Sequence, residues 1–163
     1  MSYLHILRDV DILADISQER LERITAIGEV KKFDGTDVIF KENTTSNELY
    51  IILNGMVEIL VDPSTLGTVE QGTTGLKTIA TLRRGESFGE VALVDQGLRS
   101  ASAMAAQYNT QLLVIPQDEF NTLCKEDFEL GYTVMRNIAG DLAFKLRQTD
   151  LMVREQILWG RKT

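Results

Sequence analysis

The sequence predicts a mainly β fold with flanking helices, built on an eight-stranded antiparallel jelly roll (a double-stranded β-helix). Short apolar runs recur at roughly ten-residue spacing between residues 30 and 115, with turn residues between them. Apolar residues recur at helical spacing before and after this region. We therefore expect one domain over residues 1–163, with N-terminal helices in 1–29, the β-roll over 30–115 and a C-terminal helix pair in 116–163.

The first well-marked element is a helix over residues 17–27. Ser17 is a favoured N-cap residue, and Leu21, Ile24 and Ile27 recur at the spacing of one helix face. The period changes after this helix, so the β region is expected to begin only where the helix ends.

The strands of the β-roll are predicted from short apolar runs, the clearest of which cover residues 37–40, 49–53, 56–61, 76–82, 101–106 and 111–115. Asn54-Gly55 separates two of these runs, and this pair is the strongest short-range signal for a hairpin with a type I′ turn. Residues 62–75 are rich in Gly, Ser and Thr and contain Pro63, so we expect a long, mobile hairpin loop there.

Helical periodicity returns after Pro116, a residue that suits the start of a helix. A short helix is expected to about Lys125, followed by a long one over residues 128–158. The apolar residues of the long helix step by four, at Leu130, Val134, Ile138, Leu142 and Leu146. They suffice for a homodimer seam through the C-terminal helix, although the heptad pattern is impure after Leu146.

Charge and composition exclude several classes of partner. The chain has 24 acidic and 17 basic side chains and a formal net charge of −7, so no nucleic-acid partner is expected. No apolar run is long enough to cross a bilayer, and Arg8 and Asp9 interrupt the N-terminus where a signal peptide needs apolar residues. The single cysteine, Cys124, favours a reducing compartment, and we expect a cytoplasmic protein without membrane contact.

The most informative stretch is residues 88–101, between two predicted strands. Gly89 lacks a side chain, so a ligand can approach the backbone closely. The predicted helical turn over residues 90–94 presents N–H groups at its N-terminus, where an anion is favoured. Arg99 can donate two N–H bonds to a phosphate, and Glu90 can accept one from a ribose hydroxyl. These groups suit a 3′,5′-cyclic nucleotide, which carries one negative charge and a free 2′-hydroxyl.

This stretch resembles the phosphate-binding cassette of the cyclic nucleotide-binding domain family, which includes the catabolite activator protein and the regulatory subunits of cyclic AMP-dependent protein kinase. The family pattern reads Phe-Gly-Glu, an aliphatic residue, Ala-Leu, a few variable residues, then Arg, a small residue and Ala. Residues 88–93 and 99–101 match it throughout. The resemblance covers nearly the whole chain and includes Gly35, Phe40 and Asn54-Gly55. It identifies the chain as a stand-alone member of the family.

The resemblance implies a role for each matching residue. Arg99 would hold the exocyclic phosphate oxygens, Glu90 would accept the ribose 2′-hydroxyl, and Ile59 and Ile79 would pack around the base. The ligand would be cAMP in preference to cGMP, with cGMP left open by the Ser100 hydroxyl. The remaining members reach the ligand through their backbone, so the expected ligand-binding set is Gly89, Glu90, Val91, Ala92, Arg99, Ser100, Ala101, Ile59 and Ile79.

The resemblance also implies a signalling mechanism, in which bound ligand draws the C-terminal helix toward the base and shifts the population of helix positions. We expect this signal to reach an unidentified effector protein, a homodimer partner or a region outside the given sequence, because residues 1–163 leave no room for a DNA-binding domain. The sequence leaves open which helix residues meet the pocket, with candidates at Tyr132, Phe144, Lys145, Thr149 and Trp159.

Two other functions are less consistent with the residues. A degenerate family member acting as a ligand-independent adaptor would not need Glu90 and Arg99, and both are intact. A metal-dependent jelly-roll enzyme would need a cluster of histidines, and the chain has one, His5. Ser100 has no obvious basic partner for nucleophilic catalysis. We therefore expect no catalytic residue, no metal ligand and no enzymatic activity.

Overall fold

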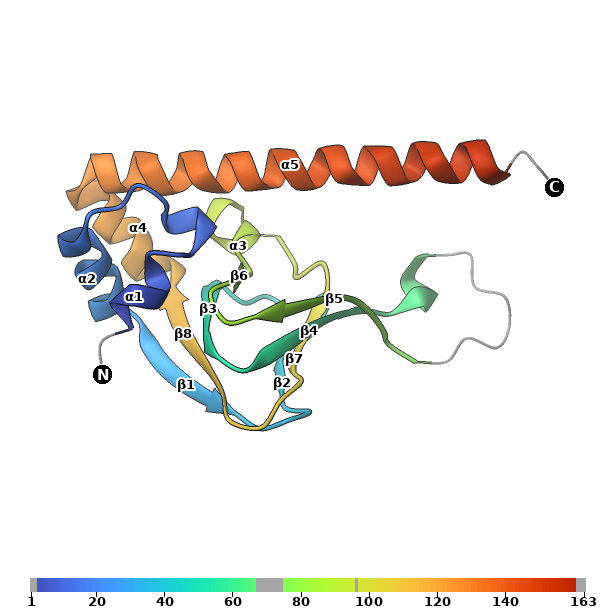
Figure 1. Ribbon diagram of the computed structural model, residues 1–163, viewed down its shortest axis with the longest axis horizontal. Helices are drawn as coiled ribbons and strands as arrows, with labels where there is room; N and C mark the ends of the chain where they lie inside the picture. Colours follow the sequence, from blue (N-terminus) through green and yellow to red (C-terminus); the bar gives the residue numbers. More distant parts are fainter. Residues whose placement is uncertain (1–2, 67–74, 96, 161–163) are drawn as a thin grey trace.

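The computed structural model describes residues 3–66, 75–95 and 97–160, and within these ranges eight β-strands form two antiparallel sheets (Figure 1). One sheet has the order β1-β8-β3-β6 and the other β2-β7-β4-β5. The strands are β1 (Glu29–Phe33), β2 (Val38–Phe40), β3 (Glu48–Asn54), β4 (Met56–Val61), β5 (Lys77–Arg83), β6 (Ser87–Phe88), β7 (Ser102–Ala105) and β8 (Thr110–Pro116). This arrangement confirms the predicted jelly roll.

Helices flank the β-roll at both ends, as the sequence predicts. The N-terminal ones are α1 (Leu4–Leu7), η1 (Asp11–Leu13) and α2 (Gln18–Ile27), and the C-terminal ones are α4 (Gln117–Glu126) and α5 (Phe128–Gly160). Two short helices lie between strands of the roll: η2 (Pro63–Leu66) after β4 and α3 (Val91–Val94) after β6. The Ser17 side chain caps α2 by accepting a hydrogen bond from the backbone N–H of Arg20. Pro116 is the N-cap residue of α4.

Strands β3 and β8 are buried on both faces, which explains their continuous apolar runs. Side chains alternate along a strand, so Leu49 and Ile51 of β3 pack into the cluster formed with the flanking helices. Tyr50 and Ile52 point the other way, into the interior of the roll. The two-sheet roll and the helices are therefore joined through one shared layer.

The predicted Asn54-Gly55 hairpin is wrong. Strands β3 and β4 lie in different sheets and do not pair with each other. The φ angle is +89° at Gly55 but is not positive at Asn54, whereas a type I′ turn needs positive φ at both positions. Gly55 instead turns the chain from one sheet to the other, and a β-carbon there would lie 2.4 Å from Oγ1 of Thr110. The sequence correctly predicted a sharp turn at Gly55, but the two strands that the turn connects do not pair with each other.

The predicted hairpin around residues 62–75 connects strands that do pair, because β4 and β5 are antiparallel neighbours. Residues 67–74 of this connection lie outside the described residues, as does Gln96 between α3 and β7.

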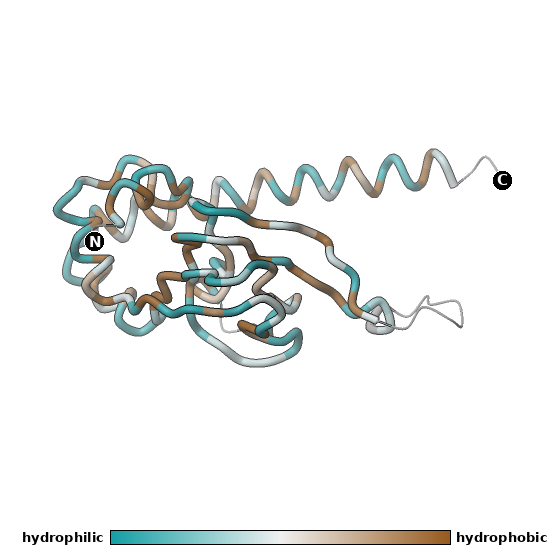
Figure 2. Tube along the Cα trace, turned by 60° about the horizontal axis from the view of Figure 1, so that its bottom comes forward, coloured by the Kyte–Doolittle hydropathy of each residue, from teal (hydrophilic) through white to brown (hydrophobic). Residues whose placement is uncertain are grey.

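Helix α5 is the longest element and passes over α3 before continuing beyond it (Figure 1). Its first half buries Leu130, Val134 and Ile138 against the body of the protein. In its second half apolar and polar residues alternate in bands (Figure 2). The apolar side chains there are exposed, including Phe144, Leu146, Leu151, Met152, Val153, Ile157, Leu158 and Trp159.

Candidate functional site

The segment between β6 and β7 begins with a sharp turn at Gly89, whose φ angle is +77°. Only glycine adopts this conformation without strain. A β-carbon at Gly89 would lie 2.8 Å from Nη1 of Arg99 and 3.0 Å from the backbone oxygen of Glu48. The absence of a side chain therefore lets the guanidinium of Arg99 lie directly against the turn.

Arg99 is buried, with about 6% of its surface exposed, and its guanidinium is held by the protein itself. Its Nη2 donates to the backbone oxygen of Glu48 at 2.8 Å, and its Nε donates to Oγ of Ser46 at 2.6 Å. A longer bond of 3.3 Å runs from Nη1 to the backbone oxygen of Gly89. These acceptors use three of the five N–H donors of the guanidinium. A phosphate must therefore bind to the remaining two N–H donors or displace one of these protein acceptors.

Aromatic rings form one wall around this cation. The Arg99 guanidinium carbon lies 4.2 Å from the centre of the Phe40 ring, a cation–π distance. The Tyr50 and Phe88 rings stack at 5.0 Å, and burial raises the pKa of the Tyr50 hydroxyl to about 12. Burial also lowers the pKa of Arg99, although a guanidinium stays charged at any physiological pH.

Backbone hydrogen bonds fix the end of the segment to the loop that follows β2. The N–H of Asn43 donates to the oxygen of Arg99 at 2.8 Å, and the N–H of Arg99 donates to the oxygen of Thr44 at 3.0 Å. Asn43 has a φ angle of +62°, a left-handed conformation that asparagine tolerates. The position of Arg99 is thus set by both its backbone and its side chain.

Glu90 is also buried, and its carboxylate forms an ion pair with Lys145 of α5. The Lys145 Nζ donates to Oε1 of Glu90 at 2.8 Å and lies 2.9 Å from Oδ2 of Asp141. Burial alone would lower the pKa of Lys145, but its hydrogen bonds to Glu90 and Asp141 outweigh that effect and raise it. Lys145 and Glu90 are therefore ion-pair partners that both line one cavity.

That cavity has a volume of about 480 Å³, within the usual range for small-molecule sites. The structure brings every residue of the sequence-predicted set to its lining: Ile59, Ile79, Gly89, Glu90, Val91, Ala92, Arg99, Ser100 and Ala101. Phe40, Leu82 and Lys145 also line it. The contacts that these residues make with a ligand remain a prediction.

The sequence did not identify which residue of the long helix meets the cavity. Lys145 lines the cavity, and the sequence analysis named it only as one of several candidate residues on the long helix. Phe144, Tyr132 and Trp159 are exposed and do not line this cavity. The hydroxyl of Thr149 donates to the backbone oxygen of Lys145 within the helix.

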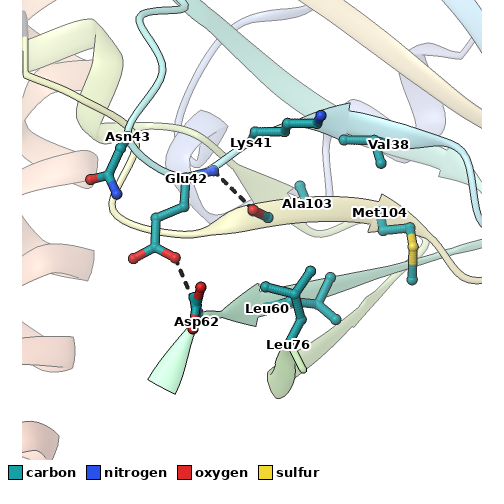
Figure 3. A pocket seen from close by; sticks show the side chains of 10 residues that line it. Val38, Lys41, Glu42, Asn43, Leu60, Asp62, Leu76, Ala103 and Met104 are labelled. Carbon is teal, nitrogen blue, oxygen red and sulfur yellow. Dashed lines mark hydrogen bonds between the residues drawn. The ribbon is translucent and has the colours of Figure 1, made fainter. Parts of the chain in front are cut away.

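A second cavity, of about 280 Å³, lies against the β2-β7-β4-β5 sheet and contains none of the predicted site residues (Figure 3). Two of its polar side chains, those of Glu42 and Ser102, already accept hydrogen bonds from the backbone of neighbouring lining residues. The Glu42 carboxylate accepts from the backbone N–H of Asp62, and the Ser102 hydroxyl accepts from the backbone N–H of Glu42. The sheet-side cavity therefore offers a weaker candidate site than the one at Arg99 and Glu90.

The described part of the chain contains no group of three or more His, Cys, Asp or Glu side chains arranged to hold a metal ion. Among the same residues, no helix combines the length and the apolar character needed to cross a bilayer.

The fold, with Arg99 and Glu90 at one cavity, defines a class of nucleotide-binding regulatory domain, and sequence comparison agrees. The profile of the cyclic nucleotide-binding domain matches residues 30–127, and the chain belongs to this family.

Curated relatives include one protein named for cGMP and one named for cyclic AMP. The chain is 32% identical over 119 residues to human cGMP-dependent protein kinase 2, covering 73% of this chain and 15% of the kinase. It is 35% identical over 113 residues to the cyclic AMP receptor protein of Thermus thermophilus, covering 69% of this chain and 46% of that protein. The chain thus spans less than half of either relative.

Solved structures share the fold. The Thermus thermophilus catabolite activator protein superimposes with a TM-score of 0.73 at 26% identity, covering 88% of this chain and 62% of that one. A cyclic nucleotide-binding domain from Methylobacillus flagellatus gives a TM-score of 0.76 at 23% identity, covering 94% and 82%.

Proposed function

We propose that this chain is a regulatory sensor that binds a 3′,5′-cyclic nucleotide, cAMP in preference to cGMP, and that it has no catalytic activity. One observation carries the proposal: buried Arg99 and buried Glu90 line the same cavity of about 480 Å³. In this proposal the Arg99 cation pairs with the single negative charge of a cyclic phosphate, and the Glu90 carboxylate accepts a hydrogen bond from the free ribose 2′-hydroxyl.

In this proposal the phosphate is bound beside Arg99, and the sugar lies toward Glu90. Gly89, Ser100 and Ala101 donate backbone N–H bonds to the phosphate. Since the guanidinium is already held against the backbone by Glu48, little side-chain entropy is lost when a ligand binds.

The proposed preference for adenine rests on the aliphatic part of the cavity lining. Ile59, Ile79 and Leu82 lie there and present no hydrogen-bonding groups. Both bases carry an exocyclic amine, but guanine also carries a carbonyl and a ring N–H, so burying it against aliphatic side chains leaves more polar groups without partners. The hydroxyl of Ser100 is the group that would satisfy guanine in the alternative, cGMP-binding form.

The proposed signal leaves through α5. A ligand that binds better when α5 lies close to the cassette shifts the helix toward that position. Exposed apolar side chains at seven-residue spacing, Phe144, Leu151 and Leu158, form a surface for a partner protein or for a second copy of the chain. A cytoplasmic location belongs to the same proposal, because the single cysteine suits a reducing compartment.

A ligand-independent adaptor is the second candidate function, and one observation favours it. Among the described residues, no buried side-chain nitrogen or oxygen lacks a hydrogen-bond partner. Each buried side-chain nitrogen and oxygen of the site thus has a partner without a ligand, which is compatible with an adaptor.

Thermal unfolding with added nucleotides separates the two candidates. A sensor is stabilised by millimolar cAMP, more weakly by cGMP, and not by linear AMP, because a ligand that binds only the folded state raises the unfolding temperature. An adaptor shows the same unfolding temperature with all three nucleotides, which would contradict the sensor function.

A further inference from the structure

The ion pair between Lys145 and Glu90 connects two distant parts of the chain. Glu90 lies at the start of the cassette, whereas Lys145 lies midway along α5. The Glu90 side chain is about 8% exposed and that of Lys145 about 54%. The carboxylate is therefore the buried partner, and the lysine reaches it from the surface.

A buried carboxylate depends on such a partner. Removing the counter-charge from a buried ion pair is strongly destabilising, because the remaining charge is left without compensation. Among the described residues, hydrogen bonds to the Glu90 side chain come from Lys145 alone, at Oε1. The helix thus supplies the group that holds this carboxylate in place.

The contact uses only one of the two carboxylate oxygens. Each carboxylate oxygen can accept hydrogen bonds on its own, so a pair at Oε1 leaves Oε2 able to accept from a ligand. Because Lys145 also lines the cavity, its ammonium group fixes the rotation of the carboxylate at the place where a ligand would meet it. Asp141, one turn earlier, contacts the same ammonium group at 2.9 Å.

We propose that Lys145 is a positioning residue for ribose recognition: it holds Glu90 so that Oε2 accepts the 2′-hydroxyl of the nucleotide. This inference rests on the proposed cyclic nucleotide function. It makes recognition of the ribose depend on the position of α5, since moving the helix away would remove the lysine from Glu90. By linkage, a ligand that uses Glu90 favours the helix position seen here.

The test compares two ligands that differ only in the group Glu90 would bind, cAMP and 2′-deoxy-cAMP. Their affinities are measured for the wild-type chain, Lys145→Met, Lys145→Arg and the matched control Lys125→Met, an exposed lysine on α4 away from the cavity. The wild type should prefer cAMP. Lys145→Met should reduce that preference by about fivefold or more, Lys145→Arg should retain most of it, and Lys125→Met should leave it unchanged.

A double variant shows whether the lysine acts through Glu90. Glu90→Ala should itself remove the preference for cAMP, and adding Lys145→Met should then reduce it no further, because no carboxylate remains for the lysine to hold. Independent, additive effects would contradict the proposal.

Two further outcomes would overturn it. If Lys145→Met weakens both ligands equally, the lysine acts on the general charge of the pocket and not on the ribose. If Lys145→Met strengthens cAMP binding, the ion pair competes with the ligand. A wild-type chain that binds neither nucleotide would instead refute the proposed function, and circular dichroism of each variant shows that it is folded.

Discussion

The guanidinium of Arg99 donates a 2.8 Å hydrogen bond to the backbone oxygen of Glu48, so the proposed phosphate-binding cation is held in place before any ligand arrives. The ring of Phe40 covers it on one side. Such an arrangement favours binding because the cation is already oriented, and it also requires the ligand to share or replace acceptors that the protein supplies.

Arg99→Ala should weaken cAMP binding by about tenfold or more, since a charged hydrogen-bond pair contributes roughly 1.5–3 kcal/mol. Calorimetric titration measures the change. The matched control is Arg84→Ala, an exposed arginine that does not line the cavity and should leave the affinity unaltered. Equal affinity in the Arg99→Ala variant and the wild type would remove Arg99 from the site.

Glu90→Gln should cost less affinity than Arg99→Ala. An amide oxygen can still accept from the 2′-hydroxyl, and Lys145 keeps its contact with Asp141. The same titrations rank the two variants. A loss equal to or greater than that of the arginine variant would contradict this order.

Gly89→Ala should lower both stability and nucleotide affinity. The positive φ angle disfavours alanine, and the new β-carbon would press on the Arg99 guanidinium and the Glu48 backbone. Gly85→Ala isolates the second effect, because Gly85 also has a positive φ angle of +87° but its added carbon would meet nothing within 4 Å. Only the Gly89 variant should lose affinity. Parallel losses in both would mean that backbone strain alone is responsible.

Asp127 should make stability depend on pH. It joins α2 to the start of α5 by accepting from Nε of Arg20 and from the backbone N–H of Leu130, and these hydrogen bonds hold its pKa below the ordinary value. A depressed folded-state pKa stabilises the fold above the unfolded pKa, and this contribution is lost as pH falls through the folded value.

Thermal unfolding across pH tests this dependence. Asp127→Asn should unfold at a lower temperature than the wild type at neutral pH, and the difference should shrink as pH falls below about 4. A difference that stays constant with pH would show that the charge of Asp127 is not the cause.

The exposed apolar residues of α5 should mediate self-association. Leu151 is exposed in the part of the helix beyond the cassette, between Phe144 and Leu158. Sedimentation equilibrium should show a dimer for the wild type and a monomer for Leu151→Glu, because a charge in an apolar seam is unfavourable. A wild-type chain that stays monomeric at high micromolar concentration would contradict the proposed seam.

The fold was predictable where local signals and burial agree. The apolar run at residues 49–53 predicted a strand, and β3 occupies these residues with five of its seven side chains buried. The cassette was recognisable because Gly89, Glu90 and Arg99 occur at fixed spacing, and the structure places all three at one cavity.

What failed depended on contacts distant in sequence. Asn54-Gly55 correctly marked a sharp turn, but only strand pairing shows that the turn connects two sheets. Lys145 could not be selected from the helix because a contact between residues 90 and 145 depends on how α5 crosses the cassette. No local pattern encodes the crossing angle of a helix that has both polar and apolar residues on its exposed turns.

Calorimetric titration of the purified chain with cAMP, set beside the Arg99→Ala variant, tests the central claim most directly. The account predicts saturable binding to one site per chain in the wild type and affinity at least about tenfold weaker in the variant. It would be contradicted by a folded wild-type chain that releases or absorbs no heat with either cAMP or cGMP at any temperature tried.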